Sequence, residues 1–142
     1  QLGVLIIAHG SPNRQWNRYI EWAIEDLKIP FPVKLSFLEF THPTIQEAIK
    51  SLESMEINYV IAMPLFISSE SGHIEEIKYI LNLRPDNPSK EPIEPIDTYL
   101  TFKLTKAIQQ HPYAIKTIAN KIRDLEKFLK RADLSLQNTN LV

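Results

Sequence analysis

The chain has 142 residues, of which 44% are hydrophobic and 23% are charged, a length and composition that suit one domain with its own core. Its formal net charge of −1 gives no support for nucleic-acid binding, which usually requires an excess of Lys and Arg. Because the chain has no cysteine, disulfides and thiolate metal sites are excluded, and any metal would be held by His, Asp, Glu or backbone oxygen.

The first predicted element is a strand from Gly3 to His9, because an uninterrupted apolar run indicates a strand buried on both faces. A helix is expected from Pro12 to Lys28, with Ser11 as its cap and Pro12 at its first position. The apolar and aromatic residues of this helix recur at helical spacing: Trp16, Tyr19, Ile20, Ala23, Ile24 and Leu27.

Two further strand–helix units follow. A strand is expected from Val33 to Phe40, before a helix that opens at Thr44 and has the capping-box spacing of Thr44 and Glu47. A third strand is expected from Tyr59 to Phe66, and a helix from about His73 to Leu83. This alternation predicts an α/β fold with right-handed crossovers and a parallel sheet that is covered by helices on both faces.

The sequence changes character after Leu83. Residues 84–95 contain four of the ten prolines and are expected to form a loop or linker. The segment from Ile93 to Tyr99 can supply a short fourth strand, and Pro95 favours an edge position for it. A helix is expected from Pro112 to Arg131. We therefore expect a single domain over residues 1–131 and a tail or truncated linker over residues 132–142.

Polar residues follow each of the first three predicted strands. His9 ends the first and Glu39 lies at the end of the second, while a loop with three serines and then His73 follow the third. Parallel strands bring these residues to one edge of the sheet, where ligands bind in open α/β folds. Two imidazoles and one carboxylate there suit a divalent first-row metal with open coordination positions, or proton abstraction beside such a metal.

Each of these residues also has a purely structural explanation. A histidine after a strand is more often a hydrogen-bonded structural residue than a ligand, and His73 can simply begin a helix. Glu39 lies between Leu38 and Phe40, so alternation can point it to solvent. Their coincidence at one predicted edge is the observation that favours a functional site.

Three motifs occur in order within residues 3–83. The first is Ala8-His9-Gly10-Ser11-Pro12 with Trp16-Asn17, the second is Phe37-Leu38-Glu39-Phe40 with Pro43-Thr44-Ile45, and the third is Met63-Pro64-Leu65-Phe66-Ile67-Ser68-Ser69 with Gly72-His73-Ile74-Glu75-Glu76. In this order and spacing they resemble the short class II tetrapyrrole chelatases, which are the sirohydrochlorin cobaltochelatases and ferrochelatases.

The resemblance implies a three-layer, flavodoxin-like chelatase lobe with a four-stranded parallel sheet. It implies insertion of Co²⁺, or of Fe²⁺ or Ni²⁺, into sirohydrochlorin or a related tetrapyrrole on the way to cobalamin or siroheme. His9 and His73 match the two catalytic, metal-binding histidines, and Glu39 matches an acidic residue near the metal. The metal is then a substrate, and no organic cofactor is expected.

These residue types fit that chemistry. Metal insertion removes two pyrrole protons, and a neutral histidine can hold the ion or accept a proton, though not with the same nitrogen at once. Glu39 can offset the charge of the ion or orient an imidazole. The carboxylates of the tetrapyrrole call for cationic or N–H partners near helix N-termini. The candidates are Ser11, Arg14, Ser68, Ser69 and Ser71, and for Arg14 a solvated helix surface is the simpler explanation.

The chain also departs from the family pattern. Many members carry Asp and Pro shortly after the second histidine, where this chain has Glu76-Ile77-Lys78-Tyr79, and residues 84–142 match poorly. The single lobe implies a homodimer or one lobe of a longer chain. No membrane partner is expected, since no apolar run approaches the roughly 18 residues of a membrane span, and the expected location is cytoplasmic, with an exported form left open.

Two other functions compete with the chelatase, and a degenerate chelatase-like lobe that serves structure or dimerisation also stays open because of the substitutions near Glu76. A histidine phosphatase or mutase usually has arginine directly before the histidine, where this chain has Ala8, so the sequence argues against one. A non-catalytic carrier of metal or tetrapyrrole could use the same ligands and stays open.

Overall fold

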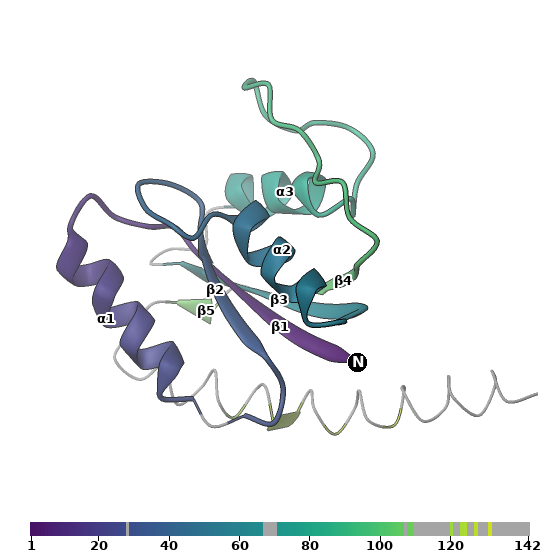
Figure 1. Ribbon diagram of the computed structural model, residues 1–142. Helices are drawn as coiled ribbons and strands as arrows, with labels where there is room; N and C mark the ends of the chain where they lie inside the picture. Colours follow the sequence, from purple (N-terminus) through teal and green to yellow (C-terminus); the bar gives the residue numbers. More distant parts are fainter. Residues whose placement is uncertain are drawn as a thin grey trace, which may run out of the picture.

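The computed structural model describes residues 1–27, 29–66, 71–106, 108–109, 120, 123–124, 127 and 131. Strands and helices alternate along the first 80 residues and two short strands follow (Figure 1). The elements are β1 (Leu2–Ala8), α1 (Arg14–Glu25), β2 (Val33–Phe37), α2 (Ile45–Ser54), β3 (Tyr59–Phe66), α3 (Ser71–Ile80), β4 (Thr101–Leu104) and β5 (Ile108–Gln109).

All strand pairs in the sheet are parallel, and the strand order is β2-β1-β3-β4. β1 lies between β2 and β3, with Val4 opposite Val33 on one side and Leu2 opposite Tyr59 on the other. The short β5 also pairs with β3, beyond the segment that pairs with β4. The predicted α/β class with a parallel sheet is confirmed.

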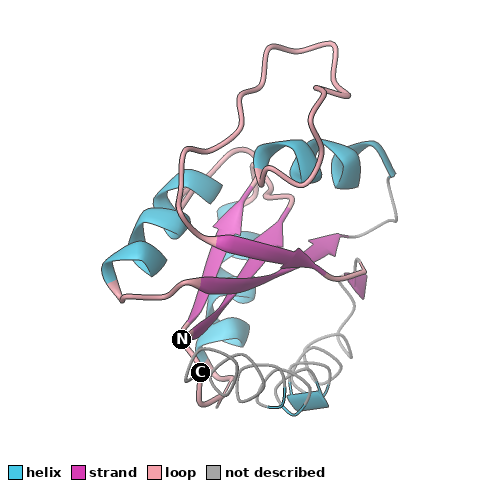
Figure 2. Cartoon of the chain, turned by 90° about the vertical axis from the view of Figure 1, so that its right-hand side faces the viewer, coloured by secondary structure: helices cyan, strands magenta, loops and turns pink. Residues whose placement is uncertain are grey.

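Two apolar clusters lie on opposite faces of the sheet and make the fold three-layered. Residues of β1 alternate between them: Ile6 joins Ile20 and Ile24 of α1, while Leu5 joins Ile49 of α2 and Ile77 of α3. Figures 1 and 2 show α1 on one side of the sheet with α2 and α3 on the other. Full burial of one such side chain stabilises the fold by about 1.5–3 kcal/mol, which explains the uninterrupted apolar run of β1.

Helix α1 begins two residues later than the predicted start at Pro12. Its cap is Asn13, whose side-chain oxygen accepts a hydrogen bond from the Gln15 N–H at 3.0 Å. Ser11 does not cap the helix, because its hydroxyl oxygen accepts a hydrogen bond from the Asn13 N–H at 3.0 Å and holds the turn before it. The predicted cap Ser11 is therefore wrong, and Asn13 takes that role.

The fourth strand also lies elsewhere than predicted, over Thr101–Leu104 instead of Ile93–Tyr99. The predicted segment bonds to the end of α3: the Ile96 N–H donates to the Ile80 carbonyl at 2.9 Å, and the Asn82 side chain donates to the Ile96 carbonyl at 2.8 Å. Figure 2 shows the loop before β4 passing over α3. Because these backbone groups are occupied, the sheet gains its next strand only after Leu100.

Two other predicted boundaries differ from the observed ones, and a predicted helix lies largely outside the described residues. The β2 strand ends at Phe37 because the chain turns at Phe40, which has a positive φ of 72°. Helix α3 begins at Ser71, two residues before His73, and ends at Ile80. The predicted helix over residues 112–131 lies largely outside the described residues, as do residues 132–142.

None of the helices in the described part of the chain has the length and apolar character needed to cross a membrane.

Glu75 on α3 anchors the start of the proline-rich loop. Its carboxylate accepts hydrogen bonds from Lys78 at 3.2 Å and from Arg84 at 2.8 Å, and Arg84 also contacts Asp86 at 3.0 Å. The hydrogen bond from Lys78, with added attraction from Lys78 and Arg84, lowers the pKa of Glu75 below its ordinary value of 4.5, although desolvation opposes the shift.

This lowered pKa predicts an acid-sensitive contribution to stability. A depressed carboxylate pKa stabilises the fold above the unfolded-state value and loses that effect as the pH falls through the folded-state value. Glu75→Gln should therefore lower the free energy of unfolding at neutral pH, and the difference from wild type should shrink below pH 4.5 and vanish once the pH has fallen through the lowered folded-state pKa of Glu75. Urea unfolding at neutral pH and in acid tests this, with Glu94→Gln, a change at an exposed carboxylate, as control. A difference that does not change with pH would contradict it.

Candidate functional site

Two histidines from distant parts of the sequence meet at the carboxyl-terminal edge of the sheet. His9 directly follows β1, and His73 lies in the first turn of α3, which follows β3. Because Ala8 pairs with Leu65 across the β1–β3 ladder, both strands end at the same level. The ring centroids lie 5.0 Å apart with the planes at 72°. The structure therefore brings together the two imidazoles that the sequence placed at one edge.

The backbone orients the ring of His9. Its Nδ1 lies 3.1 Å from the carbonyl oxygen of Gly10. A carbonyl oxygen only accepts hydrogen bonds, so this contact favours the neutral tautomer with the proton on Nδ1. The other ring nitrogen, Nε2, then carries the lone pair that can bind a metal ion or accept a proton.

A carboxylate accompanies His73. Its Nδ1 lies 3.7 Å from an oxygen of Glu76, one turn further along α3, and both side chains are half-buried. The separation makes this an electrostatic contact that gains strength when the imidazole is protonated. Glu76 can thus stabilise positive charge that arrives at the histidine pair, whether as a proton or as a metal ion.

The segment after β2 closes one side of the site. The N–H groups of Leu38 and Glu39 donate to the carbonyls of Ala8 and His9 at 2.9 and 3.0 Å. The side chain of Glu39 is exposed. Among the described residues no group of three or more His, Asp or Glu side chains is arranged to hold one metal ion. The structure thus assembles the two histidines, and the role of Glu39 as a third metal-binding residue stays a prediction.

The residues predicted to hold substrate carboxylates are placed only in part. Ser11 is half-buried in the turn after His9, and Arg14 is exposed at the first position of α1. Ser71 is the first residue of α3, at a helix N-terminus as expected. Ser68 and Ser69 lie outside the described residues. Substrate binding by all five stays a prediction.

Asn17, which belongs to the first motif but to which the sequence assigned no role, is a structural support of the site. It is only 5% exposed, its side-chain oxygen accepts a hydrogen bond from the Ser11 N–H at 2.9 Å, and its amide donates to the Ser11 carbonyl at 2.6 Å. These two bonds fix the turn that follows His9 and Gly10. The available signal was a polar residue on the face of α1 that also carries Ile20 and Ile24.

Removal of this side chain should destabilise the protein. Asn17→Ala leaves the Ser11 backbone groups without these partners in a partly buried place, so we expect a loss of about 1–3 kcal/mol in the free energy of unfolding. Urea titration measures it. Asn13→Ala, which removes the exposed cap of α1, is the matched control and should cost about 1 kcal/mol. A smaller loss for Asn17→Ala than for Asn13→Ala would contradict the assignment.

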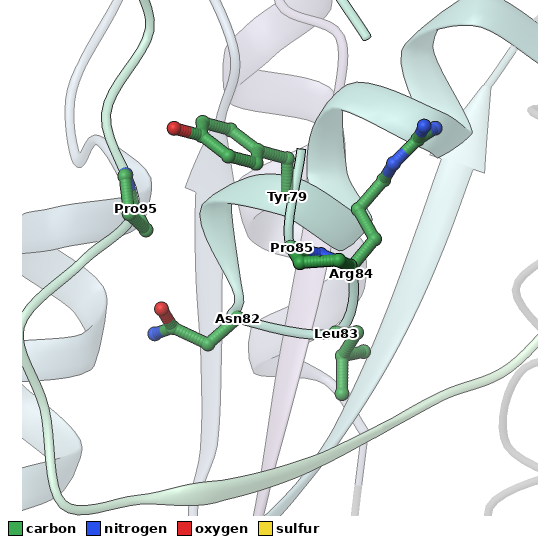
Figure 3. A pocket seen from close by; sticks show the side chains of 6 residues that line it. All are labelled: Tyr79, Asn82, Leu83, Arg84, Pro85 and Pro95. Carbon is green, nitrogen blue, oxygen red and sulfur yellow. The ribbon is translucent and has the colours of Figure 1, made fainter. Parts of the chain in front are cut away.

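Two hollows lie away from the histidine pair. One, of about 380 Å³, lies at the far end of α3 from His73 and is lined by Tyr79, Asn82, Leu83, Arg84, Pro85 and Pro95 (Figure 3). The other, of about 420 Å³, lies between α1 and the start of β2, with Glu21, Phe31 and Lys34 among its lining residues. The metal-binding and proton-accepting groups converge at neither hollow, so the strand edge is the stronger candidate site.

Comparison with known proteins identifies a family whose model covers most of the chain. The model of the CbiX family matches residues 3–125, a range that includes both histidines. A sirohydrochlorin cobaltochelatase from Methanococcoides burtonii is 30% identical over 106 residues, which cover 72% of this chain and 81% of that protein. Another, from Saccharolobus islandicus strain L.S.2.15, is 29% identical over 89 residues, which cover 60% and 67%.

A solved structure supports the fold. The crystal structure of a CbiX protein from Marinobacter aquaeolei VT8 superposes with a TM-score of 0.58 and 18% identity, and covers 92% of this chain and 99% of that one. At this identity the likeness concerns the arrangement of strands and helices.

Proposed function

Because this chain belongs to the CbiX family, we propose that it is a chelatase that inserts a divalent metal into a tetrapyrrole. The proposed ring is sirohydrochlorin or a close relative, and the proposed metal is Co²⁺, with Fe²⁺ or Ni²⁺ as alternatives. The names of the relatives support this substrate pair. The observation that carries the proposal is the His9–His73 pair, with ring centroids 5.0 Å apart at the strand edge.

The reaction exchanges one metal ion for two protons. The ring loses two pyrrole N–H protons and gains M²⁺, so charge balances when both protons leave. In this proposal Nε2 of His9 is available either to hold the ion or to accept a pyrrole proton, because Nδ1 is engaged with Gly10. One nitrogen cannot do both at once, so the neighbouring His73 takes the second role.

Acidic side chains assist the exchange. Glu76, 3.7 Å from His73, offsets the positive charge of the incoming ion and of a protonated imidazole. Glu39 is proposed to do the same from the segment after β2. Sets of nitrogen and oxygen ligands bind cobalt and nickel readily, so such a site selects its metal poorly and supply decides which ion enters.

The carboxylates of the ring need partners at the rim of the site. We propose Ser11, Arg14, Ser68, Ser69 and Ser71 for this role. The positions of Arg14 and Ser71 at the first residues of α1 and α3 support it, because helix N-termini attract anions.

A visible-absorbance assay tests the proposed function. Sirohydrochlorin is mixed with Co²⁺, then with Ni²⁺ and Fe²⁺ under anaerobic conditions, with and without the protein. Formation of metallated ring well beyond one equivalent of protein, faster than the uncatalysed reaction, is the expected result. Tight binding of ring or metal without acceleration would indicate a carrier and overturn the proposal.

We also propose that two such lobes complete the functional assembly, either as a homodimer or within a longer chain. The resemblance to the short chelatases supports the homodimer. Sedimentation equilibrium distinguishes a dimer from a monomer that requires a second lobe.

A further inference from the structure

One large aromatic side chain stands exposed beside the histidine pair. Phe40 is 63% exposed, and its ring centroid lies 6.4 Å from that of His9, with the planes tilted by 48°. Phe37, three residues earlier in the same segment, is fully buried. Full burial of such a side chain would contribute about 1.5–3 kcal/mol, so the exposed ring forgoes stabilisation at this position.

The backbone holds Phe40 in an unusual conformation. Its φ is +72°, a left-handed value that is uncommon for bulky residues and costs about 1–3 kcal/mol. The neighbours over-determine this conformation: the Glu39 N–H donates to the His9 carbonyl, and the Thr41 N–H donates to the Glu39 carbonyl, both at 3.0 Å. The same backbone that positions His9 therefore positions the ring of Phe40.

We propose that Phe40 is an apolar platform for the flat, conjugated ring of the tetrapyrrole. This inference rests on the proposed chelatase function and adds a substrate-binding residue to it. Aromatic rings associate favourably at centroid separations of 4.5–7 Å in offset or tilted arrangements. A tetrapyrrole is wide enough for one pyrrole to contact Phe40 while the central nitrogens lie over His9 and His73.

Two apolar residues near His9 are less available than Phe40. Leu38 is half-buried and packs with the core cluster that includes Ile49, and Ala8 is fully buried. The imidazoles and Glu76 supply polar contacts, which suit the metal and the protons. Phe40 supplies what these groups cannot, a hydrophobic contact with the ring face.

The test removes the ring of Phe40 and keeps its backbone. Phe40→Asn is suitable because asparagine tolerates the left-handed region. Binding of metal-free sirohydrochlorin is measured by absorbance titration, and KM is measured separately for the ring and for Co²⁺. We expect the Kd and KM for the ring to rise by about 10- to 100-fold. The kcat and the KM for Co²⁺ should change little in Phe40→Asn. Phe40→Tyr, which keeps an aromatic ring, should bind the tetrapyrrole as wild type does.

Controls separate this proposal from the function on which it rests. Trp22→Ala removes an equally exposed aromatic residue, 61% exposed on α1, and should leave all constants unchanged. If wild type binds and metallates the tetrapyrrole and Phe40→Asn does so equally well, the proposed role of Phe40 is overturned and the proposed chelatase function is not. If wild type neither binds nor metallates the tetrapyrrole, both proposals are overturned. Phe40→Gly, also suited to positive φ, is a second ring-free variant should Phe40→Asn not fold.

Discussion

Replacement of His9 or His73 with alanine is expected to lower the kcat of cobalt insertion by about 100- to 10,000-fold, the range that a positioned acid–base group contributes. The rings lie 5.0 Å apart, so the two side chains can act on one ion and its departing protons together. Each alanine removes one of the two roles, and the remaining imidazole cannot fill both with a single available nitrogen.

A variant that lacks both His9 and His73 tests whether the two histidines act together. Residues that act as a unit show strongly non-additive losses, so the variant without both histidines should be little slower than either single variant. The initial rate of metallated-ring formation at saturating ring and Co²⁺ measures all three. Additive losses in the free energy of activation would indicate independent roles.

A third histidine provides the matched control. His42 is exposed, and its Nδ1 lies 2.6 Å from the Glu47 carboxylate on α2, so it is engaged in the entry to that helix. His42→Ala should keep kcat within about twofold of wild type. A loss of kcat equal to that of His9→Ala would mean that the effect is not specific to the His9–His73 pair. Wild-type kcat in both His9→Ala and His73→Ala would overturn the proposed roles.

Apolar runs in the sequence were sufficient to locate the two central strands of the sheet. The β3 strand spans Tyr59–Phe66 as predicted, and β1 lies one residue from its predicted bounds, because both are central strands buried on two faces. Parallel topology follows from the alternation of strands and helices, and it places the residues after β1 and β3 at one edge. The proximity of His9 and His73 was predictable for that reason.

Details that depend on long-range contacts were not predictable. The capping box at Thr44 is half formed: its hydroxyl accepts from the Glu47 N–H at 3.2 Å, but the Glu47 carboxylate bonds to His42. The exposure of Phe40 could not be anticipated either, because an apolar residue after Leu38 continues a strand pattern. Its positive φ depends on bonds to β1, which no local pattern encodes.

Close approach of the Glu39 backbone makes Gly10 sensitive to substitution. Gly10 has a φ of +90°, and an added Cβ would overlap the Glu39 carbonyl oxygen and lie 3.1 Å from its carbonyl carbon. The obstacle is backbone that is itself bonded to His9, so it cannot move without displacing the site. Gly10→Ala should lower the free energy of unfolding by about 3 kcal/mol or more, through strained φ and steric overlap together.

Gly3→Ala is the matched control for this prediction, since it adds the same methyl group to a glycine within β1. Its Cβ would lie 3.1 Å from Ile57 Cγ2 and Leu52 Cδ2, which are methyl groups of buried side chains and not backbone atoms, and Gly3 has no positive φ. We expect a loss of about 1–2 kcal/mol in the free energy of unfolding, smaller than at Gly10, since only side chains need to shift by a few tenths of an ångström. Urea unfolding of both variants measures the difference. Equal losses would mean that the segment after β2 yields easily, and Gly10→Ala should then also leave kcat unchanged. A large loss in both stability and kcat at Gly10 alone would show that one backbone contact holds the fold and the histidine pair together.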